Sequence, residues 1–179
     1  MTSVRVVASA QLSPADLDSM RALFEEAWRD EGFTDDDWDH SFPGVHFIVG
    51  DDGDVRSHAA VVDRELRVAG RPLRTGYIEN VATRESDRGR GLGSAVVSAA
   101  DEHIRSTAEL GALGTGEFAF YERLGWERWR GPTSVRTGGR EERTPEEDGS
   151  VMVLRTPRTP ADLDVEAPIS CDWRPGDVW

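Results

Sequence analysis

The chain has 179 residues, of which 37% are hydrophobic and 31% charged, and its net charge is −13. This length and composition indicate one globular domain with a core, and the acidic balance excludes the basic footprint of a nucleic-acid-binding protein and disfavours an anionic membrane surface. The negative field would attract a cationic small molecule, although acidity that only keeps the protein soluble is the simpler explanation of the charge taken alone.

The first half of the chain mixes strand and helix signals. After a predicted strand at Ser3–Ser9, Ser13 is a typical N-cap and Pro14 suits the first helical position. Apolar residues then recur at helical spacing until Gly32, and Thr34 predicts the cap of a second helix that reaches Phe42. Strands are expected next at Val45–Val49, Val55–Val68 and Leu73–Thr83, with a hairpin turn at Asp51–Gly53.

The second half is predicted to open with a long helix at Gly91–Glu109. A strand at Gly111–Leu113, a short helix at Glu117–Leu124, a strand at Trp126–Val135 broken near Gly131-Pro132 and a last strand at Val151–Leu154 are expected after it. Residues 138–150 have no periodicity and predict a loop. The segment 156–179 holds four prolines, but Trp173 and Trp179 predict that it docks on the protein through their rings. No linker is visible, so residues 1–179 are expected to form a single domain.

Few residues suggest secretion or redox chemistry. Cys171 is the only cysteine, which rules out a disulfide within the chain and suits a reducing compartment. Residues 1–13 lack the apolar stretch of a secretory signal, and the longest apolar run, Ala59–Val62, is too short to cross a bilayer. The expected compartment is the cytoplasm. No histidines show metal-ligand spacing, so no metal is expected.

The strongest motif joins a strand to the long helix and reads Arg88-Gly89-Arg90-Gly91-Leu92-Gly93. Its glycines allow a sharp turn that points several N–H groups at one spot, the helix dipole adds partial positive charge, and two arginines add full charges. A diphosphate would fit this turn. A glycine-rich turn with solvated arginines remains the alternative from these residues alone.

Two motifs in sequence resemble those of the GCN5-related N-acetyltransferases, the GNAT superfamily. Arg88, Gly91 and Gly93 match the acetyl-CoA signature of that superfamily, and Phe120-Tyr121-Glu122-Arg123-Leu124-Gly125-Trp126 matches a second motif about thirty residues on. The resemblance implies an α/β fold with a mostly antiparallel central sheet, splayed at the acetyl-CoA site and flanked by helices. It further implies that residues 88–93 bind the cofactor, together with Val81 and Ala82 from a strand whose N–H groups face the thioester.

Three residues are candidates for the chemistry of acetyl transfer. By resemblance, the N–H group of Val81 polarises the thioester and Tyr121 protonates the departing thiolate. Glu79 lies in an apolar strand, where alternation places it on one side with Tyr77 and Val81, and it is a candidate base for the amine. Packing of Tyr121 in the core and a surface position of Glu79 at the strand end are the alternatives.

Acidic runs with interleaved aromatic residues suggest the substrate. Residues 30–39 and 141–148 are rich in acids, which suits a polycationic ring compound, although solvated charge runs explain them equally. Here the sequence resembles the aminoglycoside 2′-N-acetyltransferases in five segments: Phe33-Thr34 with Asp37-Trp38, Gly76–Glu79, Leu110–Leu113, Gly131–Val135 and Cys171–Trp179. This resemblance implies that Asp37, Trp38, Glu79, Glu147, Asp177 and Trp179, with its carboxylate, line the drug site.

The expected function is therefore acetyl-CoA-dependent N-acetylation of the 2′-amine of aminoglycosides, in a ternary complex. An acetyltransferase for another polycationic amine and a non-catalytic acyl-CoA sensor are the alternatives. The resemblance also implies a homodimer, for which no sequence feature shows an interface. Gly32 and Gly114 stand where relatives carry polar residues, and this difference bears on the range of drugs accepted.

Overall fold

The computed structural model describes residues 2–179, which divide into two compact units. The first unit takes the described residues up to Val62 together with Ile78–Glu102, and the second takes Asp63–Tyr77 and His103–Trp179. Strands β3 (Ser57–Val68) and β4 (Arg71–Thr83) and helix α3 (Leu92–Thr107) run from one unit into the other. Met1 lies outside the described residues.

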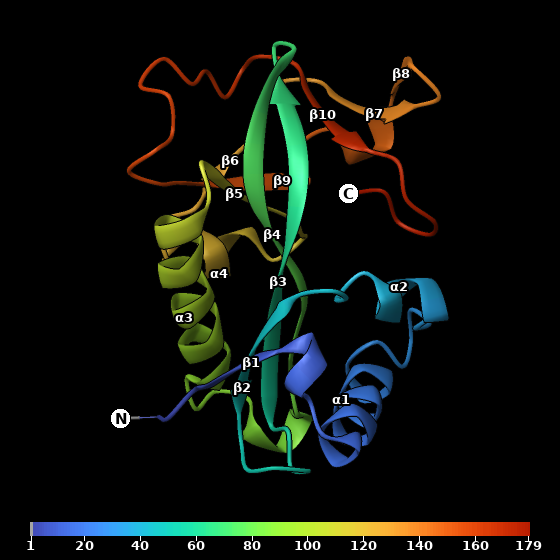
Figure 1. The fold of residues 1–179 in the computed structure, drawn as a ribbon, viewed down its shortest axis with the longest axis vertical. Coiled ribbons are helices and arrows are strands. Elements are labelled where there is room, and N and C mark those ends of the chain that lie inside the picture. The colour runs from blue at the N-terminus through green and yellow to red at the C-terminus, as the bar shows by residue number, and fades with distance from the viewer. Residues whose placement is uncertain (1) are drawn as a thin grey trace. The chain divides into compact units, whose positions relative to one another are not determined.

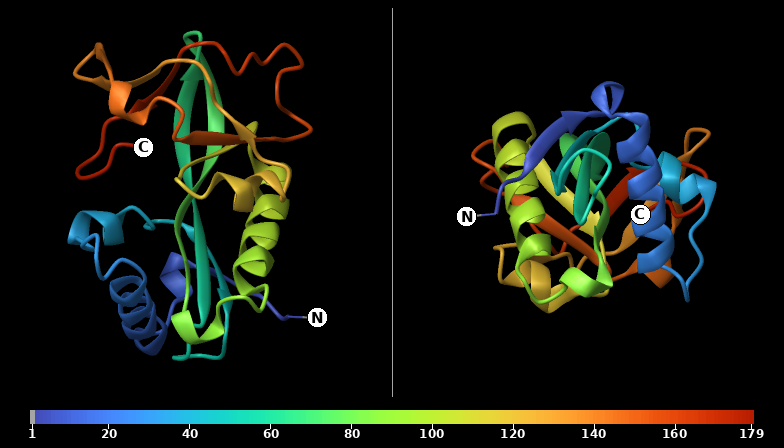
Figure 2. Two further views of the ribbon diagram at one scale, coloured as in Figure 1. Left: turned by 180° about the vertical axis from the view of Figure 1, so that it is seen from behind. Right: turned by 90° about the horizontal axis from the view of Figure 1, so that it is seen from below.

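The first unit is built on an antiparallel ladder of β1 (Arg5–Ala8), β2 (Val45–Val49) and the start of β3. Helix α1 (Pro14–Ala27) and the beginning of α3 lie on opposite sides of β2 and β3 (Figure 1 and Figure 2). The short helix α2 (Asp35–Asp39) and the 3₁₀ turns η1 (Ser9–Gln11) and η2 (Glu85–Asp87) complete the unit.

Both predicted helix starts of this unit are confirmed by their caps. The side chain of Ser13 accepts from the N–H of Asp16 at 3.0 Å. Thr34 and Asp37 form a reciprocal capping box at the start of α2, in which each side chain bonds the main-chain N–H of the other, so two otherwise unpaired donors are satisfied. The apolar face of α1 packs into a buried cluster made by Met20, Leu23, Phe24, Ile48, Val55 and Ala82.

The second unit carries a mixed sheet with the strand order β6-β9-β5-β4-β3-β10-β7-β8. Its further elements are β5 (Leu110–Gly114), α4 (Phe118–Glu122), β6 (Glu127–Arg128), β7 (Thr133–Thr137), β8 (Arg140–Arg143), η3 (Pro145–Glu147), β9 (Val151–Arg155) and β10 (Ile169–Asp172). The β4–β5 and β10–β7 pairs are parallel, and the other registered pairs are antiparallel. Registered pairing of β4 with β5 ends at Tyr77 and Ala112, although both strands continue.

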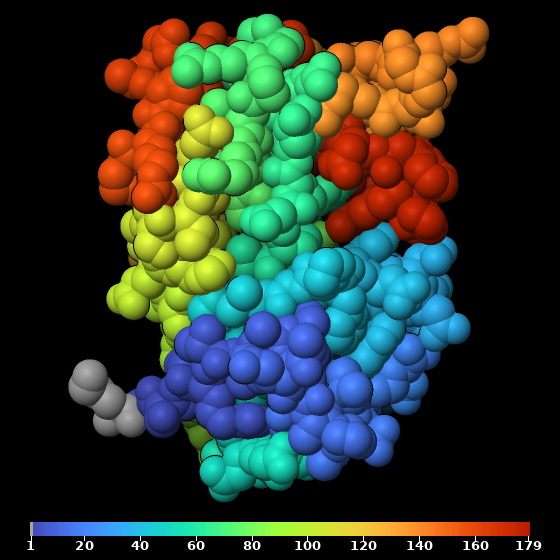
Figure 3. All heavy atoms as spheres, viewed as in Figure 1, coloured from blue at the N-terminus to red at the C-terminus, as the bar shows by residue number. Residues whose placement is uncertain are grey.

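Two sequence predictions for this unit were wrong in detail. The predicted loop at 138–150 contains β8 and η3, because a strand of four exposed charged residues carries no hydrophobic pattern. The break predicted near Gly131-Pro132 is confirmed, since residues 129–132 separate β6 from β7. Val151–Leu154 is not the last strand, because Ile169–Asp172 pairs with both β3 and β7 as β10. Figure 3 shows the C-terminal segment adjoining the β7–β8 segment on one face.

Within the described residues, no helix has both the length and the apolar character needed to cross a membrane.

Candidate functional site

The glycine-rich turn precedes α3 in the first unit, as predicted. Gly89 and Gly91 have φ angles of 75° and 78°, in the left-handed region that favours glycine. A Cβ atom added to either glycine would meet no atom within 4 Å. The first helical hydrogen bond runs from the N–H of Ala95 to the carbonyl of Gly91 at 3.0 Å. The turn therefore leaves open space beside the positive end of a 16-residue helix.

Asp87 organises the base of this turn, and the sequence analysis missed it. The Arg56 guanidinium binds both carboxylate oxygens of Asp87, with Nε to Oδ2 at 3.0 Å. Arg90 also bonds Asp87, at 3.1 Å. The hydrogen bond from Arg56 is the main reason that the pKa of Asp87 is lowered. The ion pair with Asp87 thereby restrains Arg90, whereas Arg88 forms no ion pair with any residue of 2–179.

Strand β4 carries the candidate residues Glu79, Val81 and Ala82. Glu79 is 9% exposed, so the alternative of a surface charge at the strand end does not hold. Asn80 has φ of 47° and interrupts the extended conformation, which asparagine tolerates better than most residues. Strict alternation of side chains ends at such a residue. Alternation therefore does not place Val81 on the same side as Tyr77 and Glu79, and that argument for the prediction does not hold.

Tyr121 lies in α4 of the second unit and is 6% exposed. Its ring meets Phe120 edge-on at a centroid distance of 4.9 Å and Trp126 at 6.0 Å. The N–H groups of Leu124 and Trp126 both donate to its main-chain carbonyl, at 2.9 and 3.2 Å. The ring is held firmly from two sides, which suits both the packing role and a fixed orientation of the hydroxyl group.

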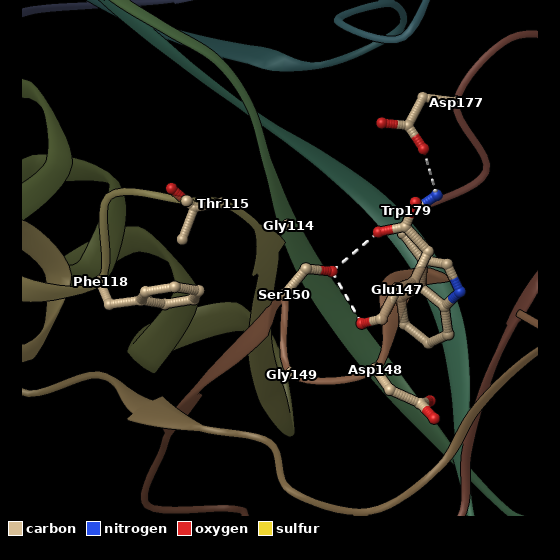
Figure 4. Close-up of a pocket in the computed structure, with 10 residues that line it drawn as sticks. Gly114, Thr115, Phe118, Glu147, Asp148, Gly149, Ser150, Asp177 and Trp179 are labelled. Atoms are coloured by element: carbon tan, nitrogen blue, oxygen red, sulfur yellow. Dashed lines mark hydrogen bonds between the residues drawn. The ribbon is translucent and has the colours of Figure 1, made fainter. Parts of the chain in front are cut away.

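An acidic cavity of about 470 Å³ lies within the second unit. It is lined by residues of β5, the turn before α4, the β8–β9 connection and the C-terminal segment (Figure 4): Gly114, Thr115, Gly116, Phe118, Glu147, Asp148, Gly149, Ser150, Asp177 and Trp179. Three residues predicted to line the drug site, Glu147, Asp177 and Trp179, are thus brought together. A Cβ on Gly114 would lie 3.5 Å from the main-chain carbon of Trp179, an ordinary contact distance.

The three side-chain carboxylates of this cavity differ in their electrostatic partners, and the main-chain oxygen of Trp179 accepts from the guanidinium of Arg174 at 3.3 Å. Asp148 pairs with Arg143 at 2.7 Å and accepts from the N–H and hydroxyl of Thr133, and the hydrogen bond from Arg143 is the main cause of its lowered pKa. Glu147 accepts from the hydroxyl of Ser150 at 2.8 Å, and Asp177 accepts from the N–H of Trp179 at 3.1 Å. Neither of these two forms an ion pair within residues 2–179. Their negative charges are available to a cation in the cavity.

The C-terminal segment is anchored by Trp179, which is 4% exposed and donates its indole N–H to Thr144 at 3.0 Å. The buried guanidinium of Arg64 donates to the carbonyls of Asp172 and Val178 at 2.8 and 2.9 Å. Trp173 is 55% exposed, so the prediction that it also anchors the segment was wrong. Arg64 was not predicted because its partners, two main-chain carbonyls and the Asp172 carboxylate at 3.1 Å, lie more than a hundred residues away in the sequence.

Asp37 and Trp38, the other predicted substrate residues, belong to the first unit. Oδ2 of Asp37 accepts from the N–H and hydroxyl of Thr34 at 2.8 and 2.7 Å as part of the α2 cap. The Trp38 ring packs against Phe24 and Phe42 at centroid distances of 5.8 and 5.2 Å. Both residues are half-buried. These contacts give each residue a structural role, and contact with the substrate stays a prediction.

Comparison with known proteins gives the family. The acetyltransferase (GNAT) domain family matches residues 10–129. The aminoglycoside 2′-N-acetyltransferase of Mycolicibacterium fortuitum is 40% identical over 181 residues, which cover 99% of this chain and 92% of that protein. This chain is an acetyltransferase of the GNAT superfamily, in the aminoglycoside 2′-N-acetyltransferase family.

Solved GNAT structures share the fold at low sequence identity. The Escherichia coli GNAT family N-acetyltransferase in complex with CoA superposes with a TM-score of 0.60 at 20% identity, covering 94% of this chain and 88% of that one. A GCN5-related N-acetyltransferase from Kribbella flavida gives a TM-score of 0.57 at 22% identity. The match covers 73% of this chain and 34% of that chain, so the chain spans about a third of its length. The fold predicted from sequence is confirmed.

As a GNAT enzyme, the protein uses acetyl-CoA as its acetyl donor. The glycine turn fits the diphosphate of this molecule, because its two left-handed glycines leave open the space that any side chain there would enter. In the part of the chain that the structure describes, no group of three or more histidine, cysteine, aspartate or glutamate side chains could hold a metal ion. Metal independence stays a prediction.

Two buried histidines of this acetyltransferase were also missed by sequence analysis. His46 in β2 and His58 in β3 are completely buried, and their rings are joined by a hydrogen bond of 3.0 Å. Burial lowers the pKa of His46 to about 4 and that of His58 to about 3. Both histidines lie in strands that were predicted from the sequence. Their contact depends on the register of these strands, in which His46 lies opposite Ala60 and His58 opposite Ile48.

Proposed function

We propose that this enzyme acetylates the 2′-amine of aminoglycosides. The observation that carries the proposal is the cavity in the second unit, in which Glu147 and Asp177 have no cationic partner within residues 2–179. The end-to-end likeness to an enzyme named for this reaction supports it. An aminoglycoside carries several ammonium groups on rigid rings, so two carboxylates that the protein leaves unneutralised are its natural partners.

The lining of the cavity suits both the ammonium groups and the apolar ring faces of such a substrate. Glu147 and Asp177 bind ammonium groups, and each is held by a neighbour, Ser150 or the main chain of Trp179. Phe118 offers a ring to an apolar face of a sugar. The net charge of −13 draws a polycation toward the protein. Asp37, Trp38 and Glu79, which lie in the first unit, stay predictions from the sequence for contact with the substrate.

The chain supplies the proton handling for the reaction. Acetyl-CoA provides an activated acetyl group in the form of a thioester. Glu79, a carboxylate in a largely apolar strand, takes the proton of the attacking amine directly or through water. Tyr121 donates a proton to the thiolate that leaves. The N–H group of Val81 stabilises negative charge on the carbonyl oxygen.

The chain also holds the donor in place through its first unit. Gly89, Gly91 and Gly93 expose the N–H groups of the turn to the diphosphate, joined by Leu92 at the helix start and Ala82 on the strand. Arg88 adds a charge that no ion pair within residues 2–179 neutralises, and Arg90 one that Asp87 fixes in position. No nucleic-acid partner is expected at this net charge. A homodimer and a cytoplasmic location remain expectations from the sequence.

The site of the new acetyl group tests the proposal. Tobramycin carries five amines, so the enzyme, acetyl-CoA and tobramycin should yield one mono-acetylated product. Two-dimensional NMR of this product should show the amide proton coupled to the proton at carbon 2′. Acetylation at any other nitrogen would contradict the 2′ assignment. Release of coenzyme A only with other polyamines would favour the alternative substrate class, and no release with any amine would favour a sensor.

A further inference from the structure

A chain of polar groups, in which both histidines are buried and Ser9 is half-buried, crosses the first unit and ends on the strand that carries Val81. Ser9 Oγ lies 2.8 Å from His46 Nε2, and His46 Nδ1 lies 3.0 Å from His58 Nε2. His58 Nδ1 lies 2.8 Å from the main-chain carbonyl of Asn80. Both histidines have no exposed surface. These groups are linked in a row, and nothing in the proposed reaction yet uses them.

The hydrogen positions of this chain are set by its last acceptor. A carbonyl oxygen can only accept, so His58 Nδ1 carries the proton. The deep burial keeps His58 neutral, and its Nε2 is then an acceptor, which requires His46 Nδ1 to donate. His46 is neutral for the same reason, so its Nε2 accepts from the hydroxyl of Ser9. Every proton therefore points along the chain toward Asn80. The N–H of Gly44 donates to Ser9 Oγ at 2.8 Å, and the carbonyl of Gly44, at 3.1 Å from Ser9 Oγ, is a second and more distant acceptor for the hydroxyl proton.

The carbonyl that ends this chain belongs to the same peptide group as the N–H of Val81. A trans peptide is planar, and its C=O and N–H bonds point in opposite directions. Because the His58 ring holds the carbonyl of Asn80, the N–H of Val81 points away from that ring. The orientation of the proposed thioester donor is thus fixed by a histidine that never meets the substrate.

The side chain of Asn80 also restrains this peptide group, through hydrogen bonds of its own. Its amide nitrogen donates to the carbonyl of Asp37 at 2.8 Å and to the hydroxyl of Ser41 at 2.7 Å. The left-handed backbone of Asn80 is thereby held by two contacts of its side chain and one of its carbonyl. The same asparagine connects the strand to α2, where the predicted substrate residue Asp37 lies.

We infer that His58 is a positioning residue for acetyl transfer. Its hydrogen bond to Asn80 orients the Asn80–Val81 peptide, and with it the N–H of Val81, and His46 holds the His58 ring in the tautomer that makes this bond. The inference rests on the proposed function in one respect, the role of Val81 as the donor to the thioester. The orientation and the tautomers do not depend on that role.

The decisive variants differ in one hydrogen-bond donor. His58→Leu removes the donor to Asn80, and His58→Asn restores an N–H at the place of Nδ1. His58→Leu should lower kcat for tobramycin about 10- to 100-fold with little change in the KM for acetyl-CoA, whereas His58→Asn should recover most of the lost turnover. Ser9→Ala is the matched control, because it damages the far end of the chain and leaves the contact with Asn80 in place. It should lower the melting temperature and keep kcat.

A folded His58→Leu enzyme with the kcat of wild type would overturn the inference, and so would a His58→Asn enzyme no better than His58→Leu. Nitrogen-15 NMR of the wild-type imidazoles gives a second test that needs no variant and no substrate. Both histidines should be neutral Nδ1–H tautomers at pH 7, and an Nε2–H or doubly protonated His58 would refute the chain. A wild type that acetylates no aminoglycoside but shows these tautomers would sink the proposed function alone.

Discussion

At the scale of single residues, the candidate functional groups differ in how firmly their neighbours hold them. Tyr121 is gripped by Phe120 and Trp126, and Glu79 is buried in β4. Asp148 looks from the sequence like another ligand for a cation, yet Arg143 and Thr133 already satisfy it. Glu147 and Asp177 are the acids of that cavity that remain for a substrate. Counting acids in a run therefore overestimates the number of binding groups.

The phenol of Tyr121 gives a prediction at this scale. Tyr121→Phe keeps the ring contacts and removes only the hydroxyl, so the fold and acetyl-CoA binding should be preserved. Turnover should fall about 10²-fold or more, the range typical for loss of a general acid. Steady-state kinetics with tobramycin and calorimetry with acetyl-CoA check this. Wild-type turnover in the phenylalanine variant would leave Tyr121 with packing alone.

Asp177 gives the second prediction. Asp177→Asn keeps the size of the side chain and removes its charge from the cavity. The KM for tobramycin should rise about tenfold or more, since a hydrogen bond to a charged group contributes about 1.5–3 kcal/mol. The matched control is Asp162→Asn, which removes the same charge from an exposed residue of the same segment outside the cavity. Equal kinetic constants in the two variants would count against Asp177 as a ligand.

At the scale of elements, the proposed function depends on two segments, the glycine turn before α3 and the C-terminal segment. The turn can accept a diphosphate because Gly89 and Gly91 have a left-handed backbone and no other residue fills the space beside them. The C-terminal segment can place Asp177 in the cavity because β10 pairs with β3 and β7, and because Arg64 and Trp179 hold the residues beyond β10 in place. Burial of a large side chain such as Trp179 contributes about 1.5–3 kcal/mol, enough to keep a chain end from fraying.

Gly91→Val tests the turn. Valine strains a left-handed backbone and places a branched side chain in space that is open in the structure. Acetyl-CoA binding, measured by calorimetry, should be lost while the variant stays folded. Gly116→Val is the control, because Gly116 also has open space around it but lies in the second unit and has no positive φ. Unchanged affinity for acetyl-CoA in a folded Gly91→Val protein would refute the diphosphate site at the glycine turn.

The elements also show how far sequence reasoning reaches. Helix starts were predictable because Ser13 and Thr34 cap their helices through side chains close in sequence. The glycine turn was predictable because it is a local motif. β8 was not, because its four residues are all exposed and charged. The His46–His58 contact and the grip of Arg64 on the C-terminal segment depend on strand register and on main-chain carbonyls, which a single sequence does not display.

At the scale of the whole molecule, the net charge of −13 sets the conditions under which substrate is captured. Attraction between an acidic protein and a polycation is long-ranged and is screened by salt, with a Debye length of about 8 Å at physiological ionic strength. The charge explains attraction in general, whereas the choice of nitrogen depends on the geometry of the site. A test of the central claim must therefore compare substrates of similar charge that differ at one position.

Kanamycin B and kanamycin A meet this requirement, because they differ only at position 2′, where kanamycin B carries an amine and kanamycin A a hydroxyl. The most direct measurement is the rate of coenzyme A release with each drug at the same ionic strength. We predict turnover with kanamycin B and none above background with kanamycin A. Equal rates with the two drugs would contradict the account.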